Sequence, residues 1–544
     1  MAIKRYGASK DTTIVNAYEP NLTTRGTGSN TGKADVGEVF SIYGRQASGS
    51  QELSRFLMQF PVTQVSTDRS NNLIPASGSV SFYLKVFNAS HSKTVPENFS
   101  LVVHAVSQSW QEGVGLDLEG YKDLTKGASG ANWMSASNTA YWTDVNGTVL
   151  AGGSYHTGST NADVDTEIHT FKQAFTTGLE DVEIDITPLV EQWIAGTYSN
   201  YGIGIKLSAS YEAFESGSAN DITSRTPGQL ALDASDDTQS VIYNPSGSVT
   251  SYYTKRFFAS GSQFFFSRPV LEARWNSVTK DDRGDFTYSS SLAPASENLN
   301  TLYLYNYIRG QLTNIPSIGT TGSIMVSLHS GNADNTNPTG SGLVLYDSTT
   351  SITGGYVSTG IYSCSIGLTG SNAAPAILFD VWHSGSQANQ HTTATQYFTS
   401  SLSPSFVSAS QRVDTPVYYM NITNLKNAYR GTETARFNLY IRSKFWDPTI
   451  YTVATTNAPT TTIHSASYKV YRVLDGLDAV KYNTGSDFGT GLSYDVSGNY
   501  FDFDMKLLDP GYAYAFKFAF YNAALNSWTE QPYSFKFRVE DYEY

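Results

Sequence analysis

The sequence predicts an all-β protein built from several β-sandwich domains. Three observations predict this class: short β-rich runs are bounded by Gly, Pro and Asn, several runs alternate apolar and polar residues with a period of two, and helical periodicity is convincing in one segment. Many short strands with frequent turns are typical of sandwiches. A length of 544 residues exceeds one ordinary core, so we expect more than one domain.

The N-terminal part contains β-rich runs at 54–63, 79–90 and 99–110, and we expect its last strand at 267–276. Polar residues then dominate the chain, which indicates a linker. The predicted organisation is a sandwich at 1–276, a linker at 277–300, a second β-sandwich at 301–410 and a C-terminal β-rich domain at 411–544.

The one convincing helical segment is "TPLVEQWIAG", residues 187–196. Four of its apolar side chains share a face: Leu189, Val190, Trp193 and Ile194. Gly196 follows them and can end the helix.

Period-two alternation is clearest near the C-terminus. It occurs in 435–446, 499–507, 512–522 and 533–542. In the first of these segments Phe437, Leu439 and Ile441 alternate with Asn438, Tyr440 and Arg442. This alternation predicts sheets with one buried face and one polar face.

The charge balance argues against several classes of partner. The formal net charge is −13, and no cluster of Lys and Arg suited to phosphate binding occurs, so we expect no nucleic-acid partner. No stretch approaches the roughly 18 apolar residues of a membrane span, so we expect no membrane partner either. Aromatic residues make up 13% of the chain, which is typical of ordered rather than disordered proteins.

Cysteine usage and the N-terminus bear on the compartment. Cys364 is the single cysteine, so no intrachain disulfide can form. The N-terminal "MAIKRYGASKDTTIV" lacks a long apolar segment, and we therefore expect no signal peptide. Both features favour synthesis and folding in a cytoplasm.

Three motifs, in order along the first 276 residues, carry a resemblance to a known family. They are "LSRFLMQFPV" (53–62), "LVVHAVSQSWQEGVGLD" (101–117) and "VEIDITPLVEQWIAGTYSNYGIGIKL" (182–207). This part resembles a DNRLRE-type β-sandwich, a jelly-roll-like domain common in bacterial surface and carbohydrate-associated proteins. The implied fold class is an N-terminal jelly-roll-like sandwich followed by one or two further β-sandwich domains.

The whole chain, with its start "MAIKRYGASKDTTI", also resembles virion structural proteins of marine tailed phages, particularly cyanophages. That resemblance implies a non-enzymatic structural protein of the neck or collar, the tail or another appendage, acting in particle assembly and host-surface attachment. Its partners would be copies of itself, other virion proteins and host cell-surface polysaccharide. It would be synthesised in the host cytoplasm and reside in the virion. The alternative is a carbohydrate-binding surface or adhesion protein.

Motifs for catalysis do not emerge from the sequence. It contains no His-Glu-x-x-His, no Gly-x-Ser-x-Gly and no phosphate-binding Gly-x-x-x-x-Gly-Lys. His383 and His391 are eight apart in a polar stretch, and we interpret them as loop residues rather than metal ligands. Cys364 lies in a strand-like run and is interpreted as a small buried residue. The sequence therefore predicts no enzyme and no cofactor.

Two weaker candidate sites remain. Asp163, Asp165 and Glu167 in "NADVDTE" offer oxygen ligands of the kind Ca²⁺ prefers. Trp133 and Trp142 lie in loop-like surroundings and are the candidates for stacking against a glycan. The tripeptide Arg-Gly-Asp within 281–286 is interpreted as a chance occurrence. Because aromatic residues are enriched at interfaces, we expect the Tyr- and Phe-rich strands of 411–544 to supply the subunit interface.

Overall fold

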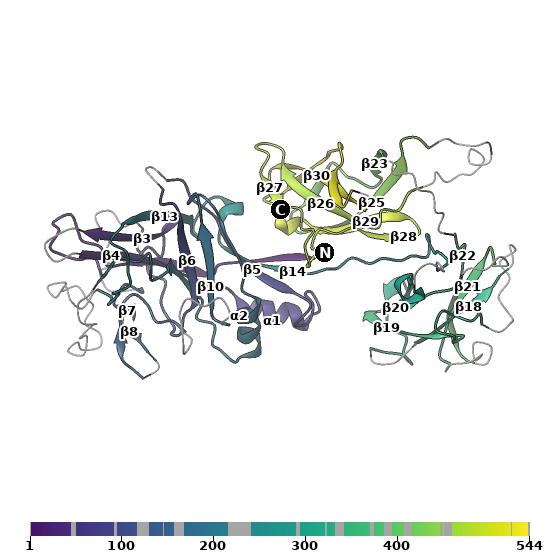
Figure 1. Cartoon of the computed structure of the whole chain (residues 1–544), viewed down its shortest axis with the longest axis horizontal. Coiled ribbons are helices and arrows are strands. Elements are labelled where there is room, and N and C mark those ends of the chain that lie inside the picture. The colour runs from purple at the N-terminus through teal and green to yellow at the C-terminus, as the bar shows by residue number, and fades with distance from the viewer. Residues whose placement is uncertain are drawn as a thin grey trace. The chain divides into compact units, whose positions relative to one another are not determined.

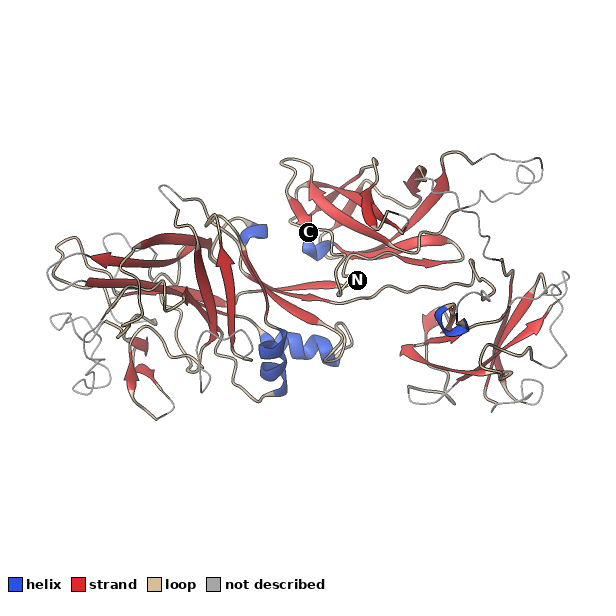
Figure 2. Ribbon diagram, in the orientation of Figure 1, coloured by secondary structure: helices blue, strands red, loops and turns tan. Residues whose placement is uncertain are grey.

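The computed structural model divides into two compact units, Ala2–Asn276 and Ser277–Tyr544, called here the N-terminal and C-terminal units (Figure 1). Strands dominate both units, which confirms the all-β prediction (Figure 2). The residues that the structure describes are 2–44, 50–91, 95–116, 130–144, 146–156, 168–215, 241–289, 294–320, 324–331, 342–369, 375–385, 394–406, 416–446, 450, 460–523 and 525–541. No helix within these ranges is long and apolar enough to span a membrane.

Two antiparallel sheets face each other in the N-terminal unit. The four-stranded sheet has the order β1 (Ile3–Gly7), β14 (Val270–Arg274), β5 (Ser81–Val86), β11 (Val182–Asp185). The seven-stranded sheet has the order β10 (Thr170–Phe175), β6 (Phe99–Ala105), β12 (Ile203–Leu207), β4 (Ser50–Gln59), β3 (Val36–Gly44), β13 (Tyr252–Phe258), and β2 (Lys10–Val15) also pairs with β4. Buried apolar side chains from both sheets form one core, which confirms a sandwich.

The seven-stranded sheet is buried on both of its faces. In β4, Phe56 and Met58 point into the core between the sheets, whereas Leu53 and Leu57 belong to a second apolar cluster on the opposite face. That cluster is covered by an outer layer, which we define as residues 130–144, 146–156, 208–215 and 241–248. The layer includes the small sheet of β7 (Ser135–Ser137), β8 (Ala140–Thr143) and β9 (Val149–Leu150). β4 therefore has apolar side chains buried on both of its faces.

The predicted helix at 187–196 is confirmed as α2 (Thr187–Ala195). Its buried residues include Leu189, Val190 and Trp193. Gly196 ends it in the left-handed conformation, with φ 75°, and its N–H donates to carbonyls of the last turn.

A second helix, α1 (Val62–Ser70), was not predicted from the sequence. Its buried face holds only Val62, Val65 and Asp68, so apolar periodicity is too sparse to signal a helix. The Asp68 carboxylate accepts hydrogen bonds from Tyr6 Oη at 2.7 Å and from Gln64 Nε2 at 3.0 Å, and it pairs with Lys4 Nζ at 2.7 Å. Tertiary contacts thus complete the face that the sequence leaves polar.

The C-terminal unit begins with a six-stranded antiparallel sheet. Its order is β15 (Asn300–Tyr305), β20 (Ile361–Ile366), β19 (Ile352–Ser358), β18 (Ile324–Ser330), β21 (Leu378–His383), β22 (Gln396–Leu402), and β16 (Tyr307–Ile308) pairs with β17 (Gln311–Leu312) beside it. Its core combines strand residues with Phe286, Tyr288 and Leu345 from outside the sheet.

Two further sheets form a sandwich within residues 416–541. The four-stranded sheet has the order β23 (Tyr418–Ile422), β25 (Thr434–Ser443), β29 (Gly498–Asp504), β28 (Ser493–Asp495). The second sheet has the order β24 (Ala428–Arg430), β32 (Phe535–Glu540), β30 (Ala513–Asn522), β26 (Ala466–Arg472), β27 (Asp478–Val480), with β31 (Ser527–Glu530) also on β30.

The Phe-rich strands of this sandwich use their rings for its own core. Phe516 of β30 is fully buried, and its ring centroid lies 4.8 Å from that of Phe437 in β25 and 5.1 Å from that of Phe501 in β29. These three rings therefore pack inside the chain, and the expected interface role of strands in 411–544 stays a prediction. The alternation in β25 is confirmed, since Phe437, Leu439 and Ile441 are buried.

We predict that Gly196→Ala destabilises the N-terminal unit by about 1–2 kcal/mol, because a Cβ is disfavoured at positive φ. No neighbouring atom lies within 4 Å of the position that this Cβ would occupy, so the backbone conformation alone sets the cost. Urea unfolding of the full chain, followed by hydrogen exchange of peptides from 2–276, measures the change. The matched control is Gly7→Ala, which also meets nothing within 4 Å but has no positive φ. Equal stability of the two variants would contradict the assignment.

Candidate functional site

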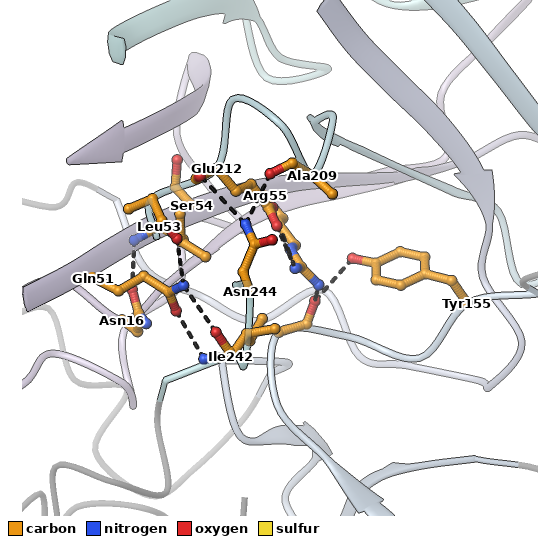
Figure 3. Close-up of polar contacts among 12 residues, drawn as sticks. Asn16, Gln51, Leu53, Ser54, Arg55, Tyr155, Ala209, Glu212, Ile242 and Asn244 are labelled. Carbon is orange, nitrogen blue, oxygen red and sulfur yellow. Dashed lines mark hydrogen bonds and ion pairs between the residues drawn. The ribbon is translucent and has the colours of Figure 1, made fainter. Parts of the chain in front are cut away.

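A buried polar network lies between β4 and the outer layer of the N-terminal unit (Figure 3). Its centre is Arg55, which follows Ser54 in β4 and projects from the face opposite Phe56. The Arg55 Nη1 donates to the Gly152 carbonyl at 2.7 Å, and Nη2 lies 3.3 Å from Oε1 of Glu212. Both side chains of this ion pair are only 6% exposed.

The surroundings of Arg55 compensate for the loss of water. Burial alone would lower the pKa of its guanidinium, but the Glu212 carboxylate and Tyr155 outweigh burial and raise it. The guanidinium carbon lies 5.3 Å from the Trp133 ring and 5.6 Å from the Tyr155 ring. Burial raises the pKa of Tyr155 to about 12, so its hydroxyl stays protonated and donates to the Gly152 carbonyl at 3.0 Å.

Neighbouring amides attach the same layer through its backbone. Gln51 Nε2 donates to the carbonyls of Ala213 and Ile242, both at 3.0 Å, and its Oε1 accepts from the Ile242 N–H at 2.8 Å. Asn244 Nδ2 donates to the Ala209 carbonyl at 2.8 Å. These bonds satisfy backbone groups that would otherwise be buried without partners. The network therefore holds the layer on the sheet, and it is enclosed rather than open to a substrate.

Two histidines of the N-terminal unit, His156 and His169, lie close together. The ring of His156 lies 6.0 Å from that of His169 and 5.0 Å from that of Tyr198. The pKa of His156 is lowered mainly by burial and to a smaller extent by the neighbouring His169. Within the described ranges, no group of three or more His, Cys, Asp or Glu side chains is arranged to hold a metal ion.

In the C-terminal unit, the first residues after Asn276 hydrogen-bond to strands on either side. The Asp281 N–H donates to the Tyr494 carbonyl at 3.1 Å, and Tyr494 Oη donates to Asp282 at 2.7 Å. Arg283 forms a two-pronged pair with Asp380 of β21, at 2.6 and 2.7 Å. Part of the expected linker 277–300 thus pairs with β28 and with the six-stranded sheet.

Arg283 of this ion pair is also the arginine of the Arg-Gly-Asp tripeptide. The Arg283 side chain is 10% exposed and that of Asp380 is fully buried. The Asp380 carboxylate accepts a second hydrogen bond, from Trp382 Nε1 at 2.7 Å. The arginine of the tripeptide is therefore occupied inside the protein and is not presented to a receptor.

The structure overturns the glycan prediction for Trp133 and Trp142. Both side chains are 0% exposed and belong to the apolar cluster beneath the outer layer. Trp142 Nε1 donates to the Asn132 carbonyl at 2.8 Å, which satisfies its polar atom in the interior. Neither ring presents a face to a sugar. The loop-like sequence around them misled the prediction, because this layer packs onto a sheet that is buried on both faces.

The other sequence candidates are placed as follows. Asp163, Asp165, Glu167 and His391 lie outside the described residues. His383 is the last residue of β21 and is buried, so its interpretation as a loop residue is wrong. Cys364 is buried in β20, as interpreted, and burial raises the pKa of its thiol.

Sequence reasoning missed two arginines that form internal ion pairs, Arg55 and Arg283. A signal for Arg55 was present, because it stands within the apolar run "LSRFLMQF". An arginine in such a run indicates a buried partner of opposite charge. Nothing in the sequence indicates which carboxylate pairs with it, since Glu212 lies 157 positions away.

A scan against protein-family models found no match, and a search of curated proteins found no similar sequence.

Burial of Asp281 generates a pH prediction. The side chain is 5% exposed, and burial raises the pKa of its carboxyl to about 6 despite the opposing effect of Arg283. A raised folded-state pKa means that stability from this group is greatest below about pH 4 and is lost as pH rises through 6. We predict that Asp281→Asn is more stable than the wild type by about 2–3 kcal/mol at pH 7, and that the difference vanishes below pH 4. Thermal unfolding across this range measures it.

The control is Asp285→Asn, four positions along the chain, where the side chain is exposed. We expect no pH-dependent stabilisation from that change. A stability difference between wild type and Asp281→Asn that stays constant from pH 4 to pH 7 would contradict the prediction.

Proposed function

We propose that the protein is a non-enzymatic structural protein of a tailed-phage virion, located in the neck or collar, the tail or another appendage. It contributes to particle assembly and to attachment at the host surface. The partners in this proposal are copies of the chain, other virion proteins and host cell-surface polysaccharide.

One structural observation carries the proposal. Strongly buried charged groups in both units are used to attach segments to sheets, as in the Arg55–Glu212 and Arg283–Asp380 pairs. Lys255 of β13 follows the same pattern, since its Nζ donates to the Gly178 carbonyl at 2.7 Å and to that of Glu180 at 3.0 Å. Buried charged side chains that hold segments in place support a structural role, in which the protein keeps a defined shape.

The three motifs quoted for the resemblance to DNRLRE-type sandwiches occupy neighbouring strands of the N-terminal unit. The segment "LSRFLMQF" lies in β4, "LVVHA" lies in β6, and the third motif runs through α2 into β12. These three strands are neighbours in the order β6-β12-β4. The motifs therefore form one contiguous region of the N-terminal sandwich.

Exposed aromatic rings of the N-terminal unit offer contacts for assembly. β13 is the last strand of the seven-stranded sheet, and its outer edge at 256–258 is already hydrogen-bonded to residues 87–89. Phe264 is 54% exposed, and its ring centroid lies 5.5 Å from that of Phe258 at the end of β13. Repeated copies around an axis would sum weak contacts of this kind.

The alternative, a carbohydrate-binding surface or adhesion protein, rested partly on Trp133 and Trp142. Because both rings are buried, that support is removed from the N-terminal unit.

Immunogold electron microscopy of phage lysate particles, with an antibody raised against residues 2–276, tests the proposal. We expect label at one fixed position on tailed particles, because a structural component occupies a defined site. Preimmune serum serves as the control. Label on cell surfaces or free polysaccharide, with unlabelled particles, would overturn the proposal in favour of the alternative.

A further inference from the structure

The outward face of the strand pair β23 and β25 is an exposed polar and aromatic surface. We define the β23–β25 face by Tyr419 and Asn421 of β23 and by Asn438, Tyr440 and Arg442 of β25. Buried residues alternate with these positions along both strands, so the five side chains project away from the sandwich core. β23 is the edge strand of its sheet (Figure 1).

Aromatic rings surround the cation at one end of this face. Tyr419 is directly opposite Arg442 in the strand register. The Arg442 guanidinium carbon lies 5.4 Å from the Tyr419 ring centroid and 5.5 Å from that of Trp446. Tyr419 is 42% exposed. The ring of Tyr419 is therefore accessible, with a positive charge beside it.

The segment just after β25 adds a second cation and an exposed aromatic ring. Phe445 is 78% exposed, and Lys444 Nζ lies 5.9 Å from its ring centroid. Within the part of the chain that the structure describes, neither Arg442 nor Lys444 has a carboxylate partner. Arg436, six residues before Arg442 in β25, differs because it pairs with Asp502 at 2.8 and 3.0 Å.

The amides of the face complete it. Asn421 and Asn438 are exposed, and among the described residues no side chain or backbone group is hydrogen-bonded to either side-chain amide. An amide both donates and accepts, which suits hydroxyl groups of a ligand. In a chain of net charge −13, Arg442 and Lys444 have no carboxylate partner among the described residues, and with the neighbouring rings and amides they form a local site of opposite sign.

We propose that the β23–β25 face, with Lys444 and Trp446, binds an anionic polysaccharide. The rings of Tyr419 and Trp446 stack against the C–H faces of sugar rings, and the Asn amides bind hydroxyls. Arg442 and Lys444 pair with carboxylate or sulfate groups along the polymer. Charge complementarity selects this occupant over a neutral glycan. The inference rests on the polysaccharide contact of the proposed function and names the chemistry of that partner. Alginate binding by the full chain tests it separately from the location of the protein on a particle.

Affinity electrophoresis of the full chain in gels containing alginate, a polyuronate, tests the inference, with neutral dextran as the comparison polymer. We expect retardation by alginate at low salt and little by dextran. Arg442→Gln should weaken alginate binding about tenfold, because it removes a charge-assisted contact. Trp446→Ala should weaken binding by removing a stacking surface.

The matched control is Arg538→Gln, an exposed arginine of β32 in the opposite sheet of the same sandwich. It should bind alginate as the wild type does, and thermal unfolding should confirm that every variant is folded. Three results would overturn the inference: no alginate binding by the wild type, equal losses in Arg442→Gln and Arg538→Gln, or equal retardation by dextran. A change of oligomeric mass in Arg442→Gln with alginate binding intact would also overturn it, because the face would then be an interface between copies.

Discussion

The buried Arg55–Glu212 ion pair is the interaction on which the N-terminal unit depends. Because the seven-stranded sheet is covered on both faces, a charge on its outer side cannot reach water and must be neutralised within the protein. Arg55 meets this requirement with a carboxylate from one segment of the outer layer and a carbonyl from another. Gln51 then fixes the remaining backbone groups of the layer. The position of the layer, and the burial of its residues Trp133 and Trp142 against the sheet, follow from these contacts.

Local patterns predicted the elements that depend on local chemistry. The alternation in β25 and the helix that ends at Gly196 were predicted because periodicity and a left-handed glycine act within a few residues. Features that depend on distant partners were not predicted. α1 is completed by the contact of Asp68 with Tyr6, and Trp133 is buried by a layer whose position no nearby residue specifies. The same limit hid the pairing of Arg283 with Asp380, which are 97 positions apart.

Buried and exposed charged groups play different parts in this protein. Inside, the Arg55–Glu212 and Arg283–Asp380 pairs are hydrogen-bonded, and each of them restrains a segment and is closed to a substrate. On the surface, the β23–β25 face presents Arg442 without a carboxylate partner in the described structure, whereas nearby Arg436 is paired. The paired interior charges support the proposed structural role. The exposed Arg442 is the reason that recognition is proposed at the outward face of β23 and β25 rather than at the loops of the N-terminal sandwich.

Hydrogen–deuterium exchange of Arg55→Lys in the full chain tests most directly whether the buried pair holds the outer layer. Lysine keeps the charge but cannot reach Gly152 and Glu212 with separate nitrogens. We predict faster exchange in 130–156 and 208–215, with unchanged exchange in β1, β5 and β14. Exchange in the outer layer equal to that of the wild type would show that apolar packing alone holds it, and would contradict this account.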